Sequence, residues 1–133
     1  MITVNGGTRN QRKYALSMAA YVCEKFNVNP TVEINFRLMS NDENYGYCTE
    51  LEDSEYEVDI KRTLNMRTML MTLAHEMVHV KQYELGELTQ DNEKGIDYWD
   101  KPSEIEAMGR EAGLFVRWAE KERLAHLKWT QTG

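Results

Sequence analysis

The chain has 133 residues, and its 22 acidic and 16 basic side chains give a formal net charge of −6 at pH 7. A chain of this length is expected to form one compact domain, residues 1–133, whose core needs no cross-links. The acidic balance argues against nucleic acid as the main partner, because duplex binding depends on Lys and Arg side chains that neutralise phosphates.

The two cysteines, Cys23 and Cys48, lie far apart in the sequence and show no paired spacing. This usage is typical of reduced thiols rather than of a disulfide framework. The first residues lack the basic start and apolar run of a signal peptide. No segment approaches the roughly 20 apolar residues that cross a bilayer. We therefore expect a soluble, cytoplasmic protein that does not bind or span a membrane.

The first element expected is a helix that begins after Thr8, because Thr8 and Gln11 have the spacing of a capping box. It should end near Phe26, since Pro30 follows closely and the residue before a proline avoids helical geometry. Three strands are expected next, and their inward faces are read from alternating residues: Val32, Ile34, Phe36 and Leu38; Tyr45, Tyr47, Thr49 and Leu51; Tyr56, Val58 and Ile60.

Short connections between these strands favour a three-stranded, mainly antiparallel meander. Gly46, inside the second strand, indicates a bulge or a close approach of the backbone to a neighbour. From about Leu64 to Leu85 the apolar period changes to 3.6, which predicts a helix that Gly86 terminates. Residues 86–101 have no apolar period and are predicted to form a loop.

A last amphipathic helix is predicted from Pro102 or Ser103 to about Leu124. Its expected buried face consists of apolar residues at helical spacing: Ile105, Met108, Ala112, Phe115 and Ala119. The order of a helix, three strands, a helix, a loop and a helix predicts an α+β fold.

The helix predicted at 64–85 contains His75-Glu76-Met77-Val78-His79. Two histidines four residues apart project from one side of a helix, so both imidazoles can reach the same metal ion. Glu76 points beside them, where a carboxylate can take a proton from a metal-bound water. The competing interpretation is a chance match in a Met-rich helix that serves only the core.

Catalytic zinc usually takes three protein ligands and keeps one position open. His126 lies near the far end of the last helix, so acids near its start are better placed. Glu104 lies about 50° from the centre of the apolar face and Glu106 about 150°, at ~100° per residue. Glu106 also has other expected partners, Ser103 in a capping box and Arg110 in an ion pair. We predict Glu104 as the third ligand, with Glu106 as the alternative.

HExxH followed on a later helix by Glu104-Ile-Glu-Ala107 resembles the gluzincin branch of zinc metallopeptidases. Similar arrangements occur in ImmA/IrrE-type peptidases and in the CAAX prenyl protease group. The order of elements and the run from His75 to Gln82 also resemble small SprT-like and phage-encoded metallopeptidases. The resemblance covers about residues 30–115. It departs from the pattern at Met108, where the gluzincins carry a polar residue, and it lacks the third histidine of SprT proteins.

This resemblance implies a zincin-like fold in which His75, His79 and Glu104 hold Zn²⁺ and Glu76 is the general base. The implied activity is hydrolysis of a protein or peptide substrate by a metal-activated water. Two other classes stay open: a non-catalytic, zinc-bound interaction protein, and an SprT-like peptidase associated with nucleic acid. The intact Glu76 argues against the first, because a structural zinc site has no use for a base.

Supporting residues are less well defined by the sequence. Tyr98 is a candidate donor to the developing oxyanion, and three other tyrosines could take that role: Tyr45, Tyr47 and Tyr83. Each of these tyrosines could equally be a packing residue. Gln82, one turn beyond His79, either orients a ligand or is a solvated polar residue. By analogy with zinc peptidases, the strand at 32–38 is expected to bind an extended substrate at its edge.

Overall fold

The computed structural model of the chain describes residues 1–40 and 44–131. Within them it has an α+β arrangement of a four-stranded sheet and three helices, as the sequence predicts in outline. The elements in chain order are β1 (Ile2–Asn5), α1 (Arg9–Phe26), β2 (Thr31–Arg37), β3 (Gly46–Glu52), β4 (Glu55–Lys61), α2 (Met66–Glu84) and α3 (Pro102–Lys121), with short 3-10 turns at Tyr98–Asp100 and Lys128–Thr130.

The strand order is β1-β2-β4-β3, with β1, β2 and β4 parallel and β3 antiparallel to β4. The predicted three-stranded antiparallel meander is therefore wrong, since β1 adds a strand and β2 lies between β1 and β4. The connection through α1 is a β-α-β crossover, which makes β1 and β2 parallel.

The inward faces of two strands agree with the prediction. Val32, Ile34 and Phe36 of β2 and Tyr56, Val58 and Ile60 of β4 are all buried. In β3 the predicted face is reversed, because Tyr47 and Leu51 are about half exposed while Cys48 packs against the core. A two-residue turn joins β3 to β4 and fixes their register, and a shift of one residue exchanges the faces of a strand. Leu38 follows the end of β2 and is 70% exposed.

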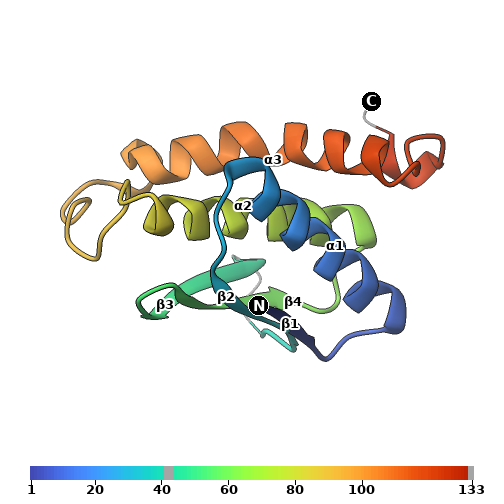
Figure 1. Cartoon of the computed structure of the whole chain (residues 1–133), viewed down its shortest axis with the longest axis horizontal. Helices are drawn as coiled ribbons and strands as arrows, with labels where there is room; N and C mark the ends of the chain where they lie inside the picture. The colour runs from blue at the N-terminus through green and yellow to red at the C-terminus, as the bar shows by residue number, and fades with distance from the viewer. Residues whose placement is uncertain (41–43, 132–133) are drawn as a thin grey trace.

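All three helices lie on the same side of the sheet (Figure 1). α2 is the central element, since it packs against β3, β4, α1 and α3. Figure 1 shows α3 running alongside α2 on the side away from the sheet. This position buries α2 on several sides, and polar residues such as Glu76, His79, Lys81 and Gln82 are buried together with its apolar residues.

Gly46 allows β3 to approach α2 closely, as one of the two interpretations of the sequence predicts. A Cβ at this position would lie 2.9 Å from Cγ2 of Thr72 and 3.1 Å from the carbonyl oxygen of Asp59. Any larger residue would push the strand away from the helix. The irregularity in the β3–β4 pairing lies elsewhere, between Glu50 and Glu52.

The helix ends follow from local sequence in two of three cases. Thr8 and Gln11 form the predicted capping box of α1. Gly86 follows α2 with a φ of 73°, a backbone conformation that suits glycine. The predicted Ser103–Glu106 capping box is wrong, because α3 begins with Pro102 and its N-cap residue, Lys101, makes no side-chain cap.

The buried face of α3 also differs from the one predicted. Ile105 is 56% exposed and Ala112 is exposed, because the helix turns a different face to α2. The residues that are buried are Ser103, Ala107, Leu114, Phe115, Trp118 and Ala119. None of the helices in the described part of the chain combines the length and apolar character that a membrane span requires.

Candidate metal site

Two histidines of α2 face the first turn of α3. His75 and His79 are one turn apart, and their ring centroids lie 5.1 Å from each other at an interplanar angle of 80°. α2 continues through this segment because its apolar residues are buried on both sides of the motif, Leu73 and Ala74 before it and Val80 after it. The histidines are therefore carried on a rigid element.

Glu104, in the first turn of α3, closes the site. Its Oε1 lies 3.0 Å from Nε2 of His75, and its Oε2 lies 2.9 Å from Nε2 of His79. One potential ligand atom from each of the three residues lies within 4.8 Å of the others. The structure thus brings together the three residues that the sequence analysis selects as metal ligands.

The donor set fits a zinc ion. Two imidazole nitrogens and one carboxylate leave the fourth position open, which is the composition of a catalytic zinc site. Ligands at about 2.05 Å around a tetrahedral ion lie roughly 3.3 Å apart. Glu104 makes its contacts of 3.0 and 2.9 Å through its two different oxygens, and one potential ligand atom from each residue lies within 4.8 Å of the others, so the three side chains are near enough to share one ion.

The three groups stabilise one another's charged forms. Burial opposes protonation of His75, but its hydrogen bond with Glu104 and its contact with the carboxylate of Glu111 outweigh burial and raise its pKa to about 10. The pKa of His79 is also raised, against the effect of burial, chiefly by Glu104. Although burial acts in the opposite direction, the two histidines hold the pKa of Glu104 well below its usual range.

Each histidine has a second polar partner at Nδ1. Oε1 of Gln82 lies 2.8 Å from Nδ1 of His79, and Oε2 of Glu111 lies 3.6 Å from Nδ1 of His75. Metal-binding histidines are commonly oriented by such a contact at the other ring nitrogen. Glu111 is not among the residues predicted from the sequence, although its position seven residues after Glu104 places both on one face of α3.

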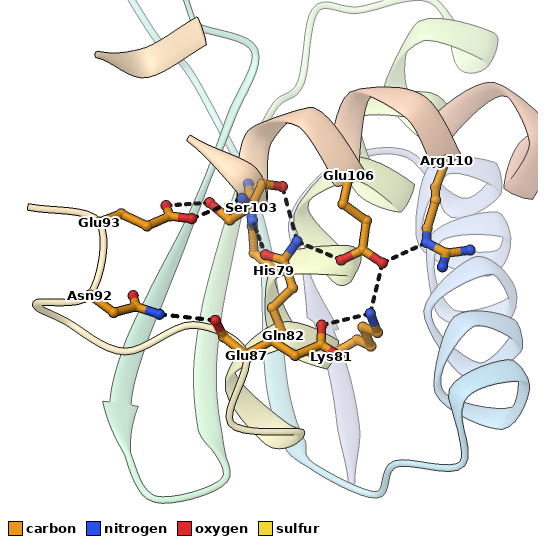
Figure 2. A network of polar contacts seen from close by, with 9 residues as sticks. All are labelled: His79, Lys81, Gln82, Glu87, Asn92, Glu93, Ser103, Glu106 and Arg110. Carbon is orange, nitrogen blue, oxygen red and sulfur yellow. Dashed lines mark hydrogen bonds and ion pairs between the residues drawn. The ribbon is translucent and has the colours of Figure 1, made fainter. Parts of the chain in front are cut away.

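Glu106 lies outside the group of potential ligands. Its carboxylate accepts hydrogen bonds from Nζ of Lys81 at 2.7 Å, Nε2 of Gln82 at 2.9 Å and Nε of Arg110 at 2.7 Å (Figure 2). The predicted ion pair with Arg110 is confirmed. Burial opposes ionisation, but these three donors lower the pKa of Glu106 to about 2.

Glu76 is buried beside the histidines, and only 7% of its surface is exposed. Burial raises its pKa, partly offset by the neighbouring charges of His79 and His75. It lines a cavity of about 180 Å³ together with His75, Tyr98, Tyr45 and others. A carboxyl group with a raised pKa next to a potential metal site is suited to exchange protons with a bound water.

The candidate tyrosines occupy different places around the site. The hydroxyl of Tyr98 is hydrogen bonded to Glu104, and burial together with that carboxylate raises the pKa of Tyr98 to about 12. Tyr45 lines the same cavity as Glu76, whereas Tyr83 lines a second one. Tyr47, on the outer face of β3, is 45% exposed.

The second cavity, of about 500 Å³, also borders the potential ligands. His79 and Glu104 contribute to its wall, as do Cys48 of β3 and several residues between 88 and 101. Each of the three potential ligands therefore lines one of the two cavities. His126 lies beyond the far end of α3 and is exposed.

Comparison of the chain with protein-family models, with curated proteins and with solved structures gives no significant match.

Proposed function

We propose that the chain is a zinc-dependent peptidase with a zincin-like fold, related in its site to the gluzincins. One observation carries the proposal: both oxygens of Glu104 meet the Nε2 atoms of His75 and His79, at 3.0 and 2.9 Å. These residues come from two helices and lie 25 or more positions apart in the sequence, and Glu76 lines a cavity together with His75.

The sheet supports a protein or peptide as the substrate. β3 is the last strand in the sheet order and packs against α2, which carries the histidines. An extended peptide could add to this edge as a further strand, next to the site. The expectation that β2 takes this role is wrong, because β2 is hydrogen bonded on both sides, to β1 and to β4.

A bound zinc ion would supply a water of lowered pKa and would polarise the carbonyl group of the scissile bond. The side chains of the chain supply the remaining chemistry. His75, His79 and Glu104 hold the ion, while the carboxylate of Glu76 accepts the proton of the attacking water and returns it to the leaving amine. Tyr98 is the candidate donor to the developing oxyanion, since its hydroxyl is already at Glu104.

The free cysteines support a reducing compartment such as the cytoplasm. Cys23 is buried and Cys48 is partly buried, and both are free thiols.

The test compares wild type with Glu76→Gln, using zinc content and cleavage of fluorescein-labelled casein as two separate readouts. We expect about one equivalent of zinc in both proteins, because Glu76 is not in the group of ligands. Cleavage should fall by about 10²–10⁴-fold in the variant, which lacks the base. Chelated wild type should recover cleavage when zinc is restored.

The outcomes separate the alternatives. Zinc without cleavage in either protein, over a panel of unfolded and peptide substrates, would support a zinc-bound interaction protein. Cleavage that survives in Glu76→Gln would reject the proposed base. Less than about half an equivalent of zinc in wild type, with unchanged stability after chelation, would reject the metal site itself. Tight, salt-dependent DNA binding would favour a peptidase associated with nucleic acid.

A further inference from the structure

Gln82 is a primary amide that is only 2% exposed. Its Oε1 lies 2.8 Å from Nδ1 of His79, and its Nε2 donates to the carbonyl oxygen of Ser103 and to Oε1 of Glu106, both at 2.9 Å. Figure 2 shows these contacts joining α2 to the start of α3. Both protons of the amide nitrogen are therefore used inside the protein.

The chemistry of these partners fixes the orientation of the amide. A backbone carbonyl and an ionised carboxylate can only accept hydrogen bonds, so they must face the NH₂ group of Gln82. Oε1 must then face His79, and since that oxygen can only accept, Nδ1 of His79 must carry a proton. Nε2 is the ring nitrogen that remains turned towards Glu104, at 2.9 Å.

Glu106 is held in turn by two cations. Lys81, which is 5% exposed, and Arg110 both donate to Oε2 of Glu106, and Lys81 also donates to Glu87. Oε1 of Glu106 is left to accept from Gln82. Burial of a lysine is costly unless its charge is paired. The charge of Lys81 is paired with the carboxylates of Glu87 and Glu106.

We propose that Gln82 is a positioning residue whose amide holds His79 as the Nδ1-protonated tautomer with Nε2 turned to Glu104, and that Glu106, fixed by Lys81 and Arg110, locks the amide. The proposal rests on the proposed function in one respect, namely that zinc binds His79 through Nε2. It gives the buried Lys81–Glu106 pair a role at the site, and it gives the alternative ligand, Glu106, a role other than binding the metal.

The experiment uses Gln82→Leu, which keeps the approximate size of the side chain and removes the acceptor, and Gln82→Glu, which keeps an acceptor at His79. Val22→Ala, in the buried face of α1, is the control for lost stability without a change at the site. Zinc affinity is measured by competition with a chromophoric chelator. The long-range ¹H–¹⁵N spectrum of the three histidine rings is recorded with and without zinc, and the exposed His126 is the internal reference.

We expect Gln82→Leu to bind zinc about 10–100-fold more weakly than wild type, and Gln82→Glu to recover part of that loss. The Nδ1 proton of His79 should be resolved and slow to exchange in wild type, with or without metal, and should exchange rapidly in Gln82→Leu. Val22→Ala should leave both readouts unchanged.

Unchanged zinc affinity and an unchanged His79 signal in Gln82→Leu would overturn the inference. An equal loss of affinity in Val22→Ala would also overturn it, because the effect would then follow stability alone. If wild type binds no zinc while its metal-free spectrum shows the protected Nδ1 proton, the proposed function fails and the role of Gln82 in holding His79 stands. If that proton is unprotected in wild type, the inference fails whatever the metal result.

Discussion

Glu93 closes the start of α3 by accepting two hydrogen bonds from Ser103. The backbone N–H of Ser103 donates to Oε2 at 2.8 Å, and its hydroxyl donates to Oε1 at 2.6 Å. The carboxylate thus does from ten residues away what an N-cap side chain does locally. The next residue is Glu104. By fixing the first turn of α3, the contact between Glu93 and Ser103 also positions the third potential ligand.

Replacing Glu93 by Ala should therefore lower the free energy of unfolding by about 1 to 2 kcal/mol, the usual value of an N-cap. Zinc affinity should fall severalfold, since Glu104 is held less firmly. Urea unfolding and chelator competition measure the two effects. Glu120→Gln, an exposed acid in the last turns of α3, is the control and should change neither by much. Equal values for the two variants would contradict this role of Glu93.

Glu104 and Glu106 should respond differently to the same substitution. Glu104→Gln should weaken zinc binding by at least about 100-fold, because it removes the anionic ligand. The zinc affinity of Glu106→Gln should stay within about tenfold of wild type. Its free energy of unfolding should fall by about 2 to 3 kcal/mol, because buried Lys81 loses its ion pair with a charged carboxylate. Metal analysis and denaturant unfolding test both. If Glu106→Gln lost zinc while Glu104→Gln kept it, Glu106 and not Glu104 would be the third ligand.

Removal of the metal should leave the protein folded. Glu104 engages both histidines directly, and the contact between α2 and α3 is also built from buried residues such as Ala107 and Leu114. At 1,000 times its Kd, zinc adds about 4 kcal/mol of stability by mass action, which corresponds to a Tm change of roughly 10–15 °C for a chain of this size. Circular dichroism with EDTA, and again with added zinc, measures this change. Complete unfolding after chelation would contradict it.

Cys23 gives a pH dependence independent of the metal site. Burial raises its pKa to about 11, from an ordinary value of 9.0. Because this pKa is raised in the folded state, the contribution of the protonated Cys23 thiol to stability is complete below pH 9 and is lost as the pH rises through 11. The loss amounts to about 2 to 3 kcal/mol.

The Cys23→Ala variant should be less stable than wild type at neutral pH, because the substitution leaves a cavity. The stability of Cys23→Ala should decline less steeply than that of wild type between pH 9 and 11. Urea unfolding across that range gives the slope of the free energy of unfolding against pH for both proteins. Parallel curves for the two proteins would show that the thiol ionises as easily in the folded state as in the unfolded one.

Local features of this chain were predictable where one short segment decides them. The capping box at Thr8, the glycine after α2 and the inward faces of β2 and β4 all appear as the sequence predicts. The order of the strands was not predictable in the same way, because the path of the chain between β2 and β3 depends on what β4 later pairs with. β1, with four residues, is too short for a clear alternating pattern.

The site divides along the same line. The spacing of His75 and His79 on one helix is a local property, whereas the contact with Glu104 requires α3 to pack against α2. Glu104 rather than Glu106 contacts the two histidines, although part of the apolar face used to select Glu104 is exposed. Ile105 and Ala112 lie outside the contact with α2, since a single helix cannot show which of its apolar residues a neighbour will cover.

The sequence by itself determined that a helix would present two imidazoles and a carboxyl group at one place, because a period of 3.6 residues follows from backbone geometry alone. Only the tertiary structure decided which acid meets those imidazoles and which residues hold them in position. The reason is that Glu93, Gln82 and Glu106 act through hydrogen bonds between elements, and such bonds form only when packing brings buried polar groups within reach of each other.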